Sequence, residues 1–216
     1  NCELQSYAAP DALICGTYCG IDFLNECIGN VTGNTFVIPN GGIDICDDLF
    51  RKYEKNSDEN FSFLFVATVN ESKGIFYILQ ALQLVQKEGY KVFLEIAGKY
   101  PPGFKKQIEQ DYPTLNVTVL GLVGIEELKK LYIENGVEMS MFGMPIITTN
   151  VDGLDEMFTD EANALKVQTR FSSVYGGLSV DVEIMANKMI RLINDKSLRK
   201  RIGQNARKLY EQKLSL

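Results

Sequence analysis

Two charged side chains in this sequence stand beside predicted helix starts, where a protein can bind an anion or a ligand rich in hydroxyl groups. Lys73 directly precedes a helical pattern, and its ammonium group together with the free amides of a helix N-terminus can hold a phosphate. A lone lysine in this position more often belongs to a solvated surface. Glu138 opens the segment EMSMFGMP, where a carboxylate either caps a helix or accepts hydrogen bonds from ribose hydroxyls. Sequence position leaves both alternatives open.

The elements that position these residues alternate from residue 60 onward. The first, FSFLFVATV (61–69), is almost continuously apolar, as is typical of a strand buried on both faces of a parallel sheet. Further strands are predicted at KVFLEIAG, NVTVLG, PIITT and NALKV, and helices at IFYILQALQLVQKEG, PPGFKKQIEQDYP and IEELKKLYIENG. This alternation predicts an α/β fold with a doubly wound parallel sheet. Two more helices, Val182–Asn194 and Ser197–Lys213, follow, and the first 58 residues are less regular apart from the strand TFVIP.

Ligands of doubly wound sheets bind outside the carboxyl ends of the strands, so the residues that follow each strand are the candidates for a site. The first strand is followed by Thr68 and then by Asn70 to Gly74, a run that includes Lys73. Gly98, Lys99 and Tyr100 follow the second, and Gly121, Leu122 and Val123 the third. Small or apolar residues at these points either accept a flat base or make tight turns.

Composition excludes several classes of function. The 216 residues contain no histidine, which excludes Ser-His-Asp and Cys-His catalysis within the chain and any histidine-based metal site. The net charge of −6 has the wrong sign for a protein that binds nucleic acid. Neither GxGxxG nor a Walker A motif occurs, which disfavours a dinucleotide-dependent oxidoreductase and a P-loop ATPase. All five cysteines lie in the first 46 residues and are interpreted as buried free thiols, with a metal or redox role as the alternative: Cys2, Cys15, Cys19, Cys27 and Cys46.

The C-terminal helix carries a basic cluster, and no apolar run is long enough to cross a membrane. The cluster consists of Arg199, Lys200, Arg201, Arg207 and Lys208. We interpret it as a solvated helix face, with contact to a membrane surface or an anionic ligand as the alternative. The expected protein is soluble, without a transmembrane segment, and is cytoplasmic or membrane-peripheral.

Seven segments of the sequence, taken together and in this order, indicate a protein family. They are VIPNGGID (37–44), FVATVNESKG (65–74), EIAG (95–98), NVTVLGLV (116–123), EELKKLY (126–132), EMSMFGMPIITTNVDGLDEM (138–157) and the basic C-terminal helices. Together they resemble the nucleotide-sugar-binding, Rossmann-like C-terminal domain of GT-B glycosyltransferases. Among these enzymes, the segments most resemble the large retaining family with a paired-Glu motif, which uses UDP-, GDP- or ADP-sugar donors. The resemblance covers residues 35–213.

The resemblance implies roles for individual residues. Lys73 and Gly74 match a Lys-Gly pair that holds the donor diphosphate, and Glu138 matches the acid that binds the ribose, so Lys73 and Glu138 become the candidate catalytic residues. Met139 and Ser140 would lie at a helix start beside the phosphates, and the backbone of Val123 would meet the base. Such sites stabilise the departing diphosphate with cationic side chains and helix amides, so neither a metal nor another cofactor is expected.

The sequence departs from the family pattern at two places. Where the family has an arginine that helps to hold the diphosphate, this chain has Thr68, which leaves Lys73 as the main cation. The first glutamate of the paired motif, with its strand and phosphate-facing loop, has no counterpart between Val137 and Glu138. Because a parallel sheet that lost an interior strand would have a hole in its middle, we expect a further segment that orders when donor binds. Gly153 and Glu156 match a glycine-and-acid turn, for which we favour a structural role.

The expected organisation is a remnant of an N-terminal domain with its hinge in residues 1–58 and a nucleotide-sugar-binding domain in residues 59–216. GT-B enzymes bind their acceptor in a separate N-terminal domain, so this chain is expected to bind donor and not to transfer sugar alone. The expected activity is transfer of a hexose from a nucleoside diphosphate sugar to an acceptor, with retention. The alternatives are a GT-B-like epimerase or phosphorylase, and a non-catalytic flavodoxin-like interaction domain.

Overall fold

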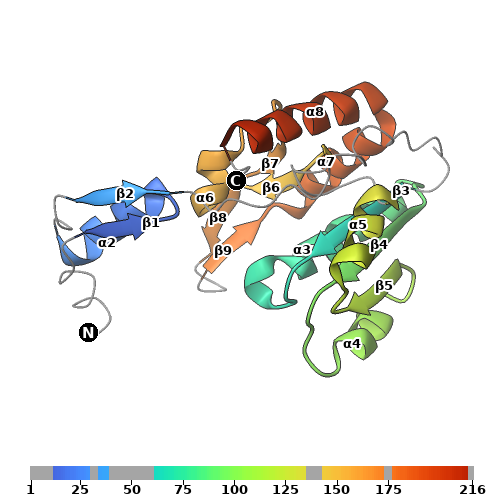
Figure 1. Ribbon diagram of the computed structural model, residues 1–216. Helices are drawn as coiled ribbons and strands as arrows, with labels where there is room; N and C mark the ends of the chain where they lie inside the picture. Colours follow the sequence, from blue (N-terminus) through green and yellow to red (C-terminus); the bar gives the residue numbers. More distant parts are fainter. Residues whose placement is uncertain (1–11, 30–33, 39–60, 135–142, 173–176, 214–216) are drawn as a thin grey trace.

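The computed structural model describes residues 12–29, 34–38, 61–134, 143–172 and 177–213 (Figure 1). Its central feature is a three-stranded parallel sheet in the order β3-β4-β5. The strands are β3 (Phe61–Val66), β4 (Val92–Ala97) and β5 (Asn116–Gly121). Each is followed by a helix: the short 3-10 helix η2 (Glu71–Lys73) with α3 (Ile75–Lys87), then α4 (Phe104–Asp111) and α5 (Ile125–Glu134).

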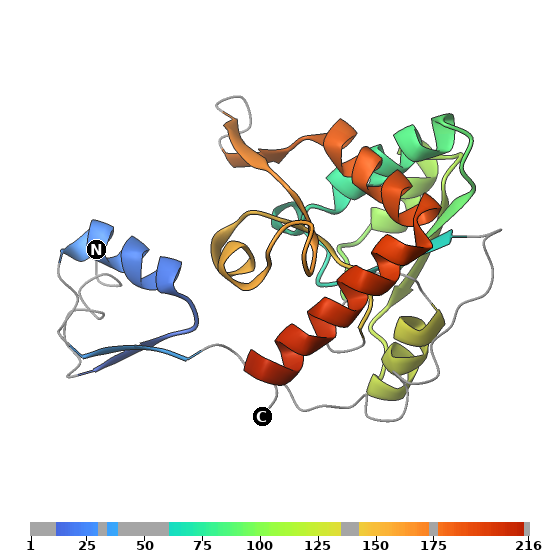
Figure 2. The ribbon, with the colours of Figure 1, turned by 90° about the horizontal axis from the view of Figure 1, so that it is seen from above.

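A second pair of parallel strands follows later in the chain, β6 (Ile147–Thr149) and β7 (Leu165–Val167), connected through α6 (Asp152–Met157). An antiparallel pair, β8 (Thr169–Ser172) and β9 (Gly177–Val180), leads to the two C-terminal helices. These are α7 (Val182–Asn194) and α8 (Lys196–Lys213), and α8 crosses the C-terminal part of the molecule when it is seen from above (Figure 2).

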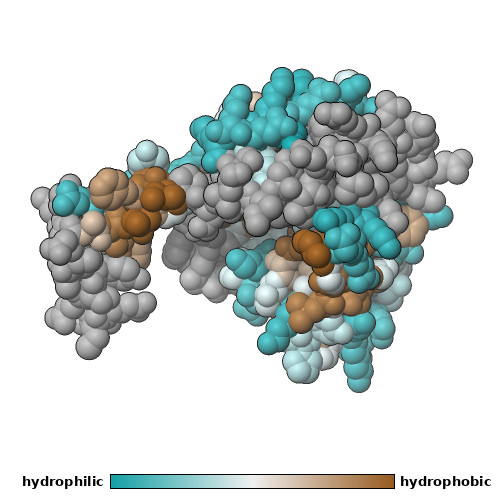
Figure 3. Space-filling view, viewed as in Figure 1, coloured by the Kyte–Doolittle hydropathy of each residue, from teal (hydrophilic) through white to brown (hydrophobic). Residues whose placement is uncertain are grey.

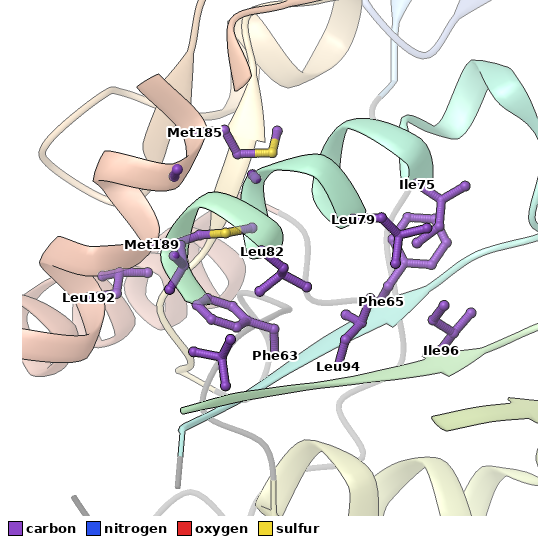
Figure 4. Packing of buried hydrophobic residues seen from close by; sticks show 14 of the residues in the cluster. Phe63, Phe65, Ile75, Leu79, Leu82, Leu94, Ile96, Met185, Met189 and Leu192 are labelled. Carbon is purple, nitrogen blue, oxygen red and sulfur yellow. The ribbon is translucent and has the colours of Figure 1, made fainter. Parts of the chain in front are cut away.

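Buried side chains explain why this part of the chain folds as a layered structure. The main hydrophobic core joins β3 and β4 to α3 and α7, with Phe63, Phe65, Leu79, Leu94 and Met189 among its members (Figure 4). A second cluster on Leu64 and Ala97, which alternate with the core residues of the same strands, packs against Leu131 and Tyr132 of α5. Helices therefore cover both faces of the sheet, which confirms the predicted doubly wound α/β fold.

The two parallel sheets share a core, yet no ladder in the described part of the chain joins β3 to β6. Leu165 and Val167 of β7 are fully buried in the same cluster as Phe63 and Phe65 of β3. Side-chain packing, and in particular the contact between α3 and α7, therefore connects the two sheets. The expected additional segment would fall within residues 135–142, which lie outside the described residues.

The N-terminal part is a small parallel unit of β1 (Leu13–Cys15), α2 (Tyr18–Ile28) and β2 (Thr35–Val37). One face of its strand pair is exposed and apolar: Ile14 is 65% exposed, Phe36 55% and Ile38 56%. The apolar surface of this unit is visible in Figure 3. The sequence predicted the strand at TFVIP but neither β1 nor α2.

Two local predictions differ from the structure. The last helix begins at Lys196, one residue before the predicted start at Ser197, and the side chain of Asp195 accepts a 2.8 Å hydrogen bond from the backbone N–H of Leu198 in its first turn. The cysteines are less buried than predicted, because Cys15 and Cys19 are half-buried and Cys27 is exposed. Cys2 and Cys46 lie outside the described residues.

Candidate functional site

The loop after β3 presents Lys73 to solvent at the start of α3. Asn70 shapes this loop, since its side-chain oxygen accepts hydrogen bonds from the backbone N–H of Lys73 at 3.1 Å and from the Ser72 hydroxyl at 2.8 Å. Gly74 then adopts a left-handed conformation (φ 73°) that turns the chain directly into α3. No side chain caps the N-terminus of α3, and within the described residues no hydrogen bond or ion pair engages the Lys73 ammonium. A cation and an uncapped helix start are thus adjacent, as predicted.

Backbone hydrogen bonds continue past the last residues of the strands and hold the three loops together. The N–H of Ala67 donates to Ala97 O at 3.1 Å, and that of Val69 donates to Lys99 O at 2.7 Å. The N–H of Gly98 donates to Gly121 O at 2.7 Å. The loops that carry Thr68 and Lys99 are therefore fixed side by side at the carboxyl edge of the sheet.

Gly98 is where two of these loops come closest. Its φ of +142° is one that side-chain-bearing residues rarely adopt, and a Cβ atom there would lie 2.0 Å from the carbonyl oxygen of Ala67. Only glycine permits the ends of β3 and β4 to approach this closely. The glycine recognised in the sequence after the second strand thus has a specific structural cause.

The loop after β5 offers apolar surface at the same edge. Leu122 is 81% exposed and Ile125 is 55% exposed, while Val123 between them is half-buried against the cluster around Leu131. Because the side chain of Val123 is turned into the protein, its backbone groups are what it can offer to a ligand. This arrangement suits the predicted contact of its backbone with a flat base.

The structure brings four of the predicted site residues to one edge of the sheet. Thr68, Lys73 and Gly74 follow β3, and Val123 follows β5, two strands away at about 4.8 Å per strand. The remaining three, Glu138, Met139 and Ser140, lie outside the described residues. In the described part of the chain, no group of three Cys, Asp or Glu side chains is arranged to hold a metal ion.

Glu156, by contrast, makes hydrogen bonds that have a structural role. Its carboxylate accepts hydrogen bonds from the backbone N–H groups of Tyr18 (2.9 Å) and Cys19 (2.5 Å) at the N-terminus of α2. The bond from Cys19, followed by that from Tyr18, lowers the pKa of Glu156 below its ordinary value. Gly153 on the same helix leaves space for Thr17, whose methyl group would lie 2.5 Å from a Cβ atom at that position. The predicted glycine-and-acid turn is thus the point at which the N-terminal unit docks on α6.

The basic cluster of α8 is largely occupied within the chain. Arg199 donates to the carbonyl oxygens of Leu192 (2.6 Å) and Ile193 (2.8 Å) at the end of α7. Arg201 donates to the backbone oxygen of Glu161 at 2.6 Å, and the buried Arg207 pairs with Glu211 at 2.7 Å. Three of its five members therefore bind protein groups; Lys200 and Lys208 are exposed. Among the described helices, none is long and apolar enough to cross a membrane.

A comparison of the sequence with protein families matches residues 47–134 to the family described as glycosyl transferases group 1. This part of the chain is similar to a glycosyl transferases group 1 domain. The matched part runs from before β3 to the end of α5 and includes Thr68, Lys73, Gly74 and Val123, whereas Glu138 follows it.

The chain is also similar to individual glycosyltransferases. The capsular polysaccharide biosynthesis glycosyltransferase CapM of Staphylococcus aureus is 28% identical over 185 residues, which are 77% of this chain and 46% of CapM. The C-terminal domain of the group 1 protein LpcC from Francisella tularensis matches with a TM-score of 0.59 at 19% identity, over 73% of this chain and 86% of that domain. Alr3699/HepE of Anabaena, in complex with UDP-glucose, matches with a TM-score of 0.74 at 16% identity, over 97% of this chain and 61% of HepE.

These relatives confirm the resemblance to the C-terminal domain of a GT-B glycosyltransferase and its Rossmann-like fold. The chain spans about half the length of CapM and about three fifths of HepE.

Proposed function

We propose that this chain is the donor-binding part of a glycosyltransferase that transfers a hexose from a nucleoside diphosphate sugar to an acceptor with retention of configuration. The observation that carries the proposal is the position of Lys73. Its exposed ammonium adjoins the uncapped start of α3 at the carboxyl edge of the sheet, and it lies inside the group 1 match. A diphosphate is the ligand whose charge and size fit this pairing.

In this proposal the chemistry of the donor side is electrostatic. Negative charge develops on the diphosphate as the bond to the sugar breaks, and Lys73 with the amides of α3 stabilises that charge without a metal ion. Glu138 would accept hydrogen bonds from the ribose hydroxyls, and Met139 and Ser140 would lie beside the phosphates. The backbone of Val123 would meet the base, next to the exposed side chain of Leu122.

The acceptor is proposed to bind to a second, N-terminal domain that closes over the donor. Two observations support this arrangement. The relatives are much longer than this chain, and the unit of residues 12–38 presents the apolar side chains of Ile14, Phe36 and Ile38 on an open face. An apolar face of this kind is what the edge of a larger domain would cover.

Titration calorimetry of the chain with UDP, GDP and ADP, and then with the corresponding sugar donors, tests the proposal. UDP is the first probe because HepE binds it. We expect at least one nucleotide to bind, and Lys73→Ala to weaken that binding about tenfold, the loss typical of a hydrogen bond to a charged group. Lys87→Ala, which removes an exposed lysine at the other end of α3, is the matched control and should bind like the unaltered chain. A folded sample that binds none of the nucleotides would overturn the proposal.

A further inference from the structure

The end of β3 has one cation, Lys73, where the resemblance implies two, because Thr68 replaces the arginine. Thr68 is exposed, and its hydroxyl cannot neutralise a diphosphate. The neighbouring strand β4 ends in Lys99, which is exposed as well. The position of Lys99 relative to Thr68 follows from the register of the two strands.

Each residue of β3 lies beside the residue of β4 that is 31 positions later, from Phe61 with Val92 to Val66 with Ala97. In a parallel ladder an N–H donates to the residue before its partner, so the bond from Val69 to Lys99 O pairs Val69 with Tyr100. The register is therefore unchanged beyond the strands, and Thr68 lies directly beside Lys99. Adjacent strands are about 4.8 Å apart.

The two residues also point to the same side of the sheet. Ala67 and Val69 pack against the main core on the α3 side, as does Tyr100. Successive residues of an extended chain alternate between faces, so Thr68 and Lys99 both face away from that core. The charge of Lys99 is on a flexible four-carbon stem, so its ammonium group can span the roughly 4.8 Å between the two strands.

The ammonium group of Lys99 is also free to bind a ligand, whereas that of the nearby Lys105 contacts an aromatic ring. The ammonium of Lys105 lies 5.4 Å from the ring centre of Tyr100, within the range of a cation–π contact. In the described part of the chain no hydrogen bond, ion pair or ring contact engages the Lys99 side chain. Lys73 and Lys99 are thus two open cations on neighbouring loops that backbone hydrogen bonds hold in place.

We propose that Lys99 is the second phosphate-binding cation of this site and replaces, from the adjacent strand, the side chain missing at position 68. This inference rests on the proposed donor site. Lys99 then contacts the diphosphate and not the nucleoside, and its contribution adds to that of Lys73.

The test measures affinity for UDP and for uridine by calorimetry at low salt, or for the nucleotide and nucleoside that bind if UDP does not. We expect Lys99→Ala to weaken UDP binding about tenfold and to leave uridine binding unchanged. Lys91→Ala, at the opposite end of β4, is the matched control, since Lys91 lies 5.7 Å over the ring of Phe93 and away from the site. Thermal unfolding of each variant confirms that the fold is retained.

A second variant moves the positive charge from position 99 to its register neighbour, position 68. It should restore binding, which a merely structural role of Lys99 would not produce. Introducing Thr68→Lys into the Lys99→Ala variant should recover most of the lost affinity for UDP, because the two positions are neighbours on one face. If Lys99→Ala binds UDP like the unaltered chain, or loses UDP and uridine equally, the inference is wrong. If no nucleotide binds the unaltered chain at all, the donor-site proposal itself fails, which is a separate outcome.

Discussion

Gly98→Ala is the substitution that tests most directly how the site is built, because two independent costs coincide there. The φ of +142° lies in a region that side-chain-bearing residues rarely adopt, which costs about 1–3 kcal/mol. The added Cβ would also lie 2.0 Å from Ala67 O and 2.7 Å from Ala67 C, backbone atoms that cannot rotate away. Crowding of this kind costs about 1–3 kcal/mol. We expect the free energy of unfolding to fall by about 2–6 kcal/mol, the sum of the two terms.

Three other glycines separate these costs. At Gly89, φ is +90° and nothing lies within 4 Å of an added Cβ, so alanine should show the strain alone. At Gly203, inside α8, a Cβ would lie 1.9 Å from Gly143 O, so alanine there causes crowding without a positive φ. The same substitution gains about 1 kcal/mol in helix propensity, which partly offsets the crowding. At Gly124 neither cost applies, and alanine should change stability by less than about 0.5 kcal/mol.

The assay is urea unfolding followed by circular dichroism, with melting temperatures as a second measure; roughly 2–4 °C per kcal/mol is expected for a chain of this size. The decisive comparison is between Gly98→Ala and Gly89→Ala. Equal losses in the two variants would show that crowding against Ala67 is not present. A loss below about 1 kcal/mol at Gly98 would refute the close approach of β3 and β4 altogether.

Two further predictions concern the charged groups that hold the loop between α6 and β7. The hydrogen bond from Arg191 (2.6 Å), opposed by burial, lowers the pKa of Glu161 below its ordinary 4.5. The stability that this pair contributes is therefore present above pH 4.5 and is lost as the pH falls through the lowered pKa. The difference in the free energy of unfolding between the unaltered chain and Arg191→Met, measured in urea, should therefore shrink from about pH 6 to about pH 3. Lys166, only 9% exposed, donates to Phe158 O (2.9 Å) and pairs with Asp155 (2.5 Å). Lys166→Met should cost about 1.5–3 kcal/mol in thermal unfolding; a loss below about 0.5 kcal/mol would contradict the role of Lys166 in ending α6.

The layered part of the fold could be predicted because its strands carry the signal in their own composition. FSFLFV and VFLEIA are apolar enough to indicate burial on both faces, and the helices between them keep one apolar side. The N-terminal unit gave no such signal. Its strands have three residues each, and Ile14 and Phe36 are exposed, so apolar positions there do not mark a core.

The candidate site was predictable only where it depends on local position. Lys73 precedes a helix in the sequence, and the structure places it there. Lys99 could not be recognised as its partner, because its place beside Thr68 depends on the register between two strands. The same holds for Glu156, whose hydrogen-bond partner Tyr18 is 138 residues away. Periodicity describes a single element, and it carries no information about which residue faces which across elements.

The contact between Glu156 and α2 has an evolutionary consequence. Two of the groups that Glu156 binds are main-chain amides, which every residue type except proline supplies, and the third is the side chain of Cys19. Divergence in the side chains at positions 18 and 19 would leave the two amide hydrogen bonds intact, whereas replacement of Glu156 would remove them. The tolerance to substitution is therefore unequal on the two sides of one interface: side chains at the start of α2 can change while the main-chain hydrogen bonds to α6 remain.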